Sequence, residues 1–284
     1  MALIVCPLCV REDDVHLVQT LPDGRKEARC DDCNFAFVYG SPREEPKPPP
    51  RKTSTPRARV TTPKASSVPI QVARKQFSAA TSISGAAIEH MTTLKDEFLS
   101  TVEYVPDPNV ESHQKKYQWV FSADGLEKAA IYDLLQFAHD TTGGDQGSTE
   151  VFDKAWTLMG EFEGARRVRA VVQHLLRGDG PVEDRFTSVA DGSYAMSMPG
   201  FDEPLVTKVL AVAEPYRFLP VLTYDAKRQI AERVLGVELP APGTAAWTIG
   251  RLAVWSNELI LEALGNGFDD LHQVAQFLDW AQRR

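Results

Sequence analysis

Residues 6–33 read CPLCVREDDVHLVQTLPDGRKEARCDDC and hold all four cysteines of the 284-residue chain. The cysteines form two pairs, Cys6 with Cys9 and Cys30 with Cys33, and two residues separate the members of each pair. This spacing lets both sulfurs of one turn face the same metal ion, and two such turns complete a tetrahedral four-sulfur site that suits zinc. The sequence therefore predicts one structural zinc ion bound by Cys6, Cys9, Cys30 and Cys33.

A β-hairpin is expected between the two cysteine pairs, with strands near residues 15–20 and 26–28 and a turn at Asp23-Gly24. Phe35, Phe37 and Tyr39 alternate with other residues and predict a third strand. The Cys-Pro-x-Cys turn at residues 6–9 resembles that of the zinc-ribbon family, and the resemblance covers residues 1–40. It implies an all-β ribbon with a structural metal that contacts nucleic acid or protein. An iron site of rubredoxin type, which uses similar ligands, and a degenerate ribbon without metal stay open as alternatives.

The predicted ribbon is acidic, with four basic and seven acidic residues. Three of its four basic residues flank the hairpin, so we expect them to form one basic edge that contacts phosphate. These residues are Arg25, Lys26 and Arg29.

Residues 41–76 contain eight prolines, nine basic residues and only two acidic ones, which gives a net charge of +7. This segment has almost no apolar side chains to bury, so we expect a disordered linker. Its cations favour a sequence-independent contact with DNA or RNA, and a solvated spacer is the alternative. The cations that we assign to this contact are Arg51, Lys52, Arg57 and Arg59.

Residues 77–284 are expected to form a mainly α-helical domain with a net charge of −12, from 18 basic and 30 acidic residues. Apolar residues recur there at helical spacing, and Gly and Pro separate the segments. One short strand is expected at Tyr117, Trp119 and Phe121, which alternate with polar residues. A helix that starts at Ser122 or Asp124 is expected to reach Ala138. Further helices are predicted at about residues 85–103, 150–159, 164–177, 203–213, 224–235, 245–264 and 269–282.

Two stretches of the helical domain are candidates for a phosphate contact. Arg166, Arg167 and Arg169 lie close together on one predicted helix, and an exposed charged face without function is the alternative. The second stretch, residues 198–210, resembles the helix-hairpin-helix segment of DNA glycosylases, with Pro199-Gly200 in the turn. The resemblance implies a phosphate contact in which Lys208 is a possible cation. Asp202 and Glu203 depart from the family pattern, because two carboxylates at this turn would repel phosphate.

A search for catalytic motifs finds no phosphate-binding loop of Gly-x4-Gly-Lys-Ser/Thr type and no Gly-x-Ser-x-Gly segment. His139-Asp140 is the one candidate start of a metal-dependent hydrolase site. His90, His113 and Asp191 are its candidate additional ligands.

Together these patterns predict a nucleic-acid-associated zinc-ribbon adaptor that is not an enzyme, contacts DNA rather than RNA, and acts in restriction, defence or repair. The Pro-x-x-Phe-Leu-Pro pattern at residues 215–220 is similar to helical modules of bacterial restriction and defence proteins, and this resemblance implies that context. A protein–protein scaffold is the alternative, and a hydrolase at His139 and Asp140 is the third hypothesis. The sequence has no apolar run of the roughly 20 residues that span a bilayer and no charged leader, so we expect a cytoplasmic protein without membrane contact.

Overall fold

The structure is a computed structural model that describes residues 15–20, 26–30, 36–39 and 68–284. The chain divides into two compact units, Met1–Thr62 and Pro63–Arg284.

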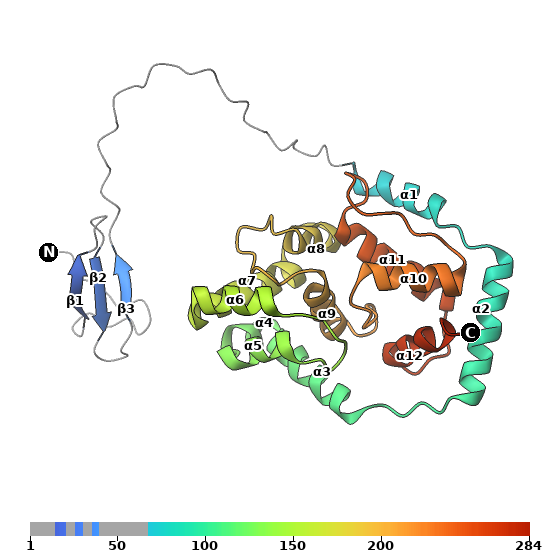
Figure 1. Ribbon diagram of the computed structural model, residues 1–284, viewed down its shortest axis with the longest axis horizontal. Helices are drawn as coiled ribbons and strands as arrows, with labels where there is room; N and C mark the ends of the chain where they lie inside the picture. The colour runs from blue at the N-terminus through green and yellow to red at the C-terminus, as the bar shows by residue number, and fades with distance from the viewer. Residues whose placement is uncertain (1–14, 21–25, 31–35, 40–67) are drawn as a thin grey trace, which may run out of the picture. The chain divides into compact units, whose positions relative to one another are not determined.

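The first unit contains a three-stranded antiparallel sheet in the order β1-β2-β3. Its strands are β1 (Val15–Thr20), β2 (Lys26–Cys30) and β3 (Ala36–Tyr39) (Figure 1). Val15 pairs with Cys30, Ala28 pairs with Phe37, and the register shifts between Leu17 and Gln19. The predicted hairpin and third strand are therefore confirmed. Cys6, Cys9 and Cys33 lie outside the described residues, and Cys30 is described only as the last residue of β2, so the zinc site stays a prediction.

The second unit is mainly helical, as the sequence predicts (Figure 1). Side-chain caps begin several of its helices, because Ser84, Asp107, Thr223, Thr248 and Asp270 each accept a hydrogen bond from a first-turn backbone amide. The helices are α1 (Ile70–Ala80), α2 (Gly85–Thr101), α3 (Pro108–Val120), α4 (Ala123–Lys128), α5 (Ile131–His139), α6 (Glu150–Met159), α7 (Glu161–Arg177), α8 (Val182–Ala190), α9 (Glu203–Ala213), α10 (Tyr224–Leu235), α11 (Ile249–Leu264) and α12 (Leu271–Ala281).

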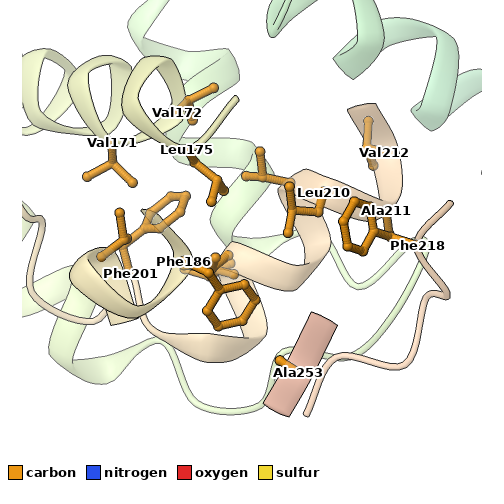
Figure 2. Packing of buried hydrophobic residues seen from close by; sticks show 14 of the residues in the cluster. Val171, Val172, Leu175, Phe186, Phe201, Leu210, Ala211, Val212, Phe218 and Ala253 are labelled. Atoms are coloured by element: carbon orange, nitrogen blue, oxygen red, sulfur yellow. The ribbon is translucent and has the colours of Figure 1, made fainter. Parts of the chain in front are cut away.

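Two apolar cores hold this unit together. In the larger core, α7, α8 and α9 pack around Leu175, Phe186 and Leu210 (Figure 2). The smaller core joins α2, α10 and α12 through residues such as Phe98 and Phe277, whose rings meet edge to face at 5.4 Å. Burial of large side chains of this kind stabilises the fold by roughly 1.5–3 kcal/mol each. In the part of the chain that the structure describes, no helix is both long and apolar enough to cross a membrane.

Several boundaries differ from the sequence prediction. Helix α1 begins at Ile70, so the C-terminal end of the predicted linker, residues 70–76, is helical instead. Residues 41–67 lie outside the residues that the structure describes. The strand predicted at residues 117–121 is wrong, because Tyr117 belongs to α3. There the buried residues His113, Tyr117 and Val120 follow helical spacing, whereas Trp119 is exposed. The predicted helix up to Ala138 is two helices, and the prediction missed α8.

Candidate functional site

The arginines that we predicted on one helix all lie on α7 and already make internal bonds. Arg166 and Arg167 share Glu163, with Arg166 Nε 2.6 Å from Oε2 and Arg167 Nε 2.9 Å from Oε1. The hydrogen bond from Arg166, with a further one from Arg167, lowers the pKa of Glu163. Arg167 Nη1 also donates to the Ser197 carbonyl at 2.8 Å. These pairs neutralise part of the expected cationic patch.

Arg169 points into the body of the unit. Its Nε and Nη2 donate to the carbonyls of Leu126 at 3.1 Å and Ala129 at 2.6 Å. Both carbonyls lie at the C-terminal end of α4, where a helix leaves its last carbonyls without internal partners. Arg177, at the end of α7, bonds in the same way to the carbonyl of Phe121, which follows α3. Arg169 and Arg177 therefore cap the C-terminal ends of two other helices, α4 and α3. Of the three predicted arginines, Arg166 is the most exposed, with 60% of its side chain exposed.

Lys208 does not contact phosphate, contrary to the prediction, because the residue is 0% exposed. Its ammonium donates to the carbonyls of Phe137, at 3.2 Å, and Asp140, and lies 3.3 Å from Gln146 Oε1. Burial lowers the pKa of Lys208 to about 8, although Asp140 and Asp145 act in the opposite direction. Lys208 thus fastens the loop between α5 and α6 to α9.

The turn at Pro199-Gly200 is also packed inside the unit. Gly200 has a φ of +76°, and a Cβ at this position would lie 2.3 Å from the backbone nitrogen of Phe152. Burial raises the pKa of Asp202 and of Glu203 above their ordinary values, and Glu203 accepts a hydrogen bond from the Tyr224 amide. Two carboxylates therefore follow the turn, on the exposed residue Asp202 and the partly buried residue Glu203, where the resemblance to a helix-hairpin-helix implies an anion.

The residues of the hydrolase hypothesis face different partners. His139 Nε2 lies 2.7 Å from Asp153 Oδ1, and its Nδ1 lies 2.9 Å from the Leu135 carbonyl. Asp140 accepts a hydrogen bond from the Thr142 amide at 2.9 Å. The structure does not bring His90 or Asp191 to them, because both are exposed elsewhere. Over residues 15–20, 26–30, 36–39 and 68–284, no group of three His, Cys, Asp or Glu side chains could hold a metal.

His113 is the fourth predicted ligand of that hypothesis, and it is buried. Its ring packs against Tyr117 with centroids 4.6 Å apart, and its Nε2 is 3.8 Å from Asp140 Oδ2, too far for a hydrogen bond. Burial lowers the pKa of His113 to about 4, with Asp140 acting in the opposite direction. His113 is therefore neutral at neutral pH and belongs to the same buried polar cluster as Lys208.

The basic residues expected on the ribbon are described only in part. Lys26 and Arg29 lie on β2 and are exposed. Because side chains alternate along a strand, two residues three positions apart lie on opposite faces. Lys26 and Arg29 therefore lie on opposite faces of β2, and the basic edge expected from Arg25, Lys26 and Arg29 stays a prediction. Arg25, Arg51, Lys52, Arg57 and Arg59 lie outside the described residues.

Arg251 is a polar residue that the sequence analysis missed. It lies in the first turn of α11 and is 4% exposed, beside a groove at the N-terminal end of that helix. The available sequence signal was an arginine three residues after a capping threonine, in the first turn of an apolar helix.

Compared with protein-family models, with curated proteins and with solved structures, the chain matches none of them.

Proposed function

We propose that this protein is a nucleic-acid-associated adaptor in which residues 1–67 make the nucleic-acid contact. The observation that carries the proposal is the segregation of charge along the chain. Residues 41–67 carry seven basic and two acidic residues, a net charge of +5, whereas residues 68–284 have a net charge of −10. Nucleic acid attracts the first segment and repels the second, because its phosphates are negative.

The contacts of the helical unit support this division. Arg167 and Arg169 donate hydrogen bonds to backbone carbonyls of the same unit. Lys208 and Lys227 are buried. A cation that is buried or fully bonded inside a domain releases no counterions from nucleic acid. The predicted zinc ribbon, with Cys6, Cys9, Cys30 and Cys33 as its ligands, would hold the strands of the first unit together.

The second candidate function is a protein–protein scaffold, and the exposed face of α6 favours it. Val151 is 62% exposed and Leu158 is 87% exposed, and their separation of seven residues places both on one side of the helix. Neighbouring exposed apolar side chains mark surfaces that bind proteins. In an adaptor, this face of the helical unit would bind a protein while the N-terminal part holds nucleic acid.

Fluorescence anisotropy with the full-length protein tests the proposal. Labelled double-stranded DNA, single-stranded DNA and RNA are titrated at two salt concentrations. One variant removes four linker cations (Arg51→Gln, Lys52→Gln, Arg57→Gln and Arg59→Gln). A control variant removes four exposed cations of the helical unit (Lys115→Gln, Lys154→Gln, Arg233→Gln and Arg283→Gln), so that both variants change the net charge equally.

We expect the linker variant to bind DNA at least about tenfold more weakly and with a smaller salt dependence, whereas the control variant binds like the wild type. Equal weakening in both variants would show that net charge alone matters, and it would contradict an N-terminal contact. If the wild type binds none of the three probes at low salt, the proposal is wrong and the scaffold takes its place.

A further inference from the structure

A groove of about 680 Å³ lies at the N-terminal end of α11, inside the second unit. This volume falls within the range of sites for small molecules. Its walls combine apolar side chains from the start of α1 and from the segment before α11 with hydroxyl groups, two carboxylates and one guanidinium. The apolar residues of the groove include Val68, Ile70, Pro242 and Ile249, and the polar ones include Thr187, Thr248, Asp184, Asp191 and Arg251.

Arg251 is the buried cation of this groove, with only 5% of its side chain exposed. Its Nη1 donates to the carbonyls of Val68, Ala245 and Ala246 at 2.9, 3.3 and 3.4 Å. Its Nε has no hydrogen-bond partner among the described residues and makes a long ion pair with Asp184, whose Oδ1 is 3.5 Å away. A buried donor of a charged group is costly without an acceptor, so Arg251 favours an anionic oxygen in the groove.

The start of α11 adds to this preference. Thr248 caps the helix, and its hydroxyl lies 2.8 Å from the hydroxyl of Thr187. The Thr187 hydroxyl also accepts a hydrogen bond from the Gly250 amide at 3.2 Å. The N-terminal end of a 16-residue helix carries a partial positive charge, which stabilises a nearby anion.

The two carboxylates restrict the charge of the anion. Asp184 has half of its side chain exposed, and Asp191 is exposed. Both would repel a dianionic phosphate more strongly than a single negative charge. The exposed side chain of Asp184 is free to turn toward solvent and leave Arg251 Nε to a ligand.

We propose that this groove binds an organic monoanion, namely a carboxylate attached to an apolar group. The carboxylate accepts hydrogen bonds from Arg251, and the apolar group lies against Val68, Ile70 and Ile249. Such a group is carried either by a free small molecule or by the C-terminal residue of a peptide. The proposal does not depend on nucleic-acid binding.

Isothermal titration calorimetry with the full-length protein tests the proposal. The small-molecule probe is 3-phenylpropionate, compared with its neutral amide and with phenyl phosphate. The peptide probe is acetyl-Ala-Val-Phe with a free carboxylate, compared with the same peptide amidated at its C-terminus. The variants are Asp184→Asn, Arg251→Met and Asp225→Asn. The last removes one carboxylate from the exposed start of α10, outside the groove, and serves as the matched charge control.

We expect the carboxylate to bind at least about tenfold more tightly than its amide or phenyl phosphate. Asp184→Asn should strengthen carboxylate binding by about threefold to tenfold, because it removes a competing charge, and Asp225→Asn should leave it unchanged. Tighter binding of the free-carboxylate peptide than of 3-phenylpropionate identifies a peptide as the source, and the reverse order identifies a small molecule.

Arg251→Met should abolish carboxylate binding. Because Arg251 also holds three carbonyls, circular dichroism must first show that this variant is folded; if it is not, Asp184→Asn decides alone. The proposal is overturned if no carboxylate binds at millimolar concentration, if the amide binds equally well, or if Asp184→Asn fails to strengthen binding.

Discussion

Replacement of the buried Lys208 by Met should change protein stability in a way that depends on pH. The substitution keeps an unbranched side chain of similar length in the same space and removes the ammonium. It leaves the carbonyls of Phe137 and Asp140 without this donor, at a cost of about 1–3 kcal/mol each. It also removes a buried charge whose pKa falls from 10.5 to about 8, a relief on the order of 3 kcal/mol at neutral pH. The two effects nearly cancel, so at pH 7 we expect the variant to lie within about 2 kcal/mol of the wild type.

The difference between the two proteins should grow as the pH rises. Between pH 8 and 10.5 the unfolded wild type binds more protons at Lys208 than the folded wild type, because the pKa in the folded state is the lower one. The free energy of unfolding of the wild type therefore increases with pH through this window. The contribution of Lys208 to this increase is about 2–3 kcal/mol between pH 7 and pH 10, and the Met variant lacks it. All other titrating groups are shared and cancel in the comparison.

Urea unfolding followed by tryptophan fluorescence measures this difference, since the chain has five tryptophans. The control is Lys154→Met, because it makes the same change of residue at a lysine whose side chain is 70% exposed. The reasoning would be refuted if the difference in free energy of unfolding between wild type and Lys208→Met stayed constant within about 0.5 kcal/mol from pH 7 to pH 10. It would mean that Lys208 is hydrated in the folded protein.

Three further predictions concern packing, capping and metal. Gly200→Ala should lower the free energy of unfolding by about 3 kcal/mol or more, because the added Cβ clashes with the Phe152 backbone. The control is Gly147→Ala, where φ is also positive, at +75°, but the space around the residue is open. It should lower the free energy of unfolding by only about 1 kcal/mol. Arg169→Met should lower the free energy of unfolding by about 2 kcal/mol in the same urea assay and leave DNA affinity unchanged. Weaker DNA binding by the folded variant would contradict the internal role of Arg169. Elemental analysis of the purified protein should find one zinc per chain, lost in Cys9→Ser, and iron in its place would support the rubredoxin-type alternative.

The helix pattern was largely predictable because apolar spacing and turn residues mark it locally. The helices at Glu150–Met159, Glu203–Ala213 and Tyr224–Leu235 begin and end where the sequence predicts. The strand prediction at Tyr117 failed because two periods overlap there: positions 117, 119 and 121 alternate, whereas positions 113, 117 and 120 follow a helix. Only tertiary packing, which buries the second set, decides between them.

The positions of charged side chains were much less predictable. Lys208 is a charged residue in an apolar helix, and its acceptors lie at the end of α5 and in the loop after it, about 70 residues earlier in the chain. Arg169 looks like part of a cationic patch, but its partners are carbonyls about 40 residues away. Local spacing contains no information about such long-range acceptors. The sequence therefore locates cations along the chain without showing which of them reach the surface.

Photo-crosslinking followed by mass spectrometry tests the central claim most directly, because it locates the nucleic-acid contact on the full-length chain. A DNA probe that contains a photoreactive base is irradiated with the protein, and crosslinked peptides are mapped after digestion. We predict crosslinks within residues 1–67 and none on α7, where Arg166, Arg167 and Arg169 lie. Crosslinks confined to α7 or to other surfaces of residues 77–284 would contradict the account.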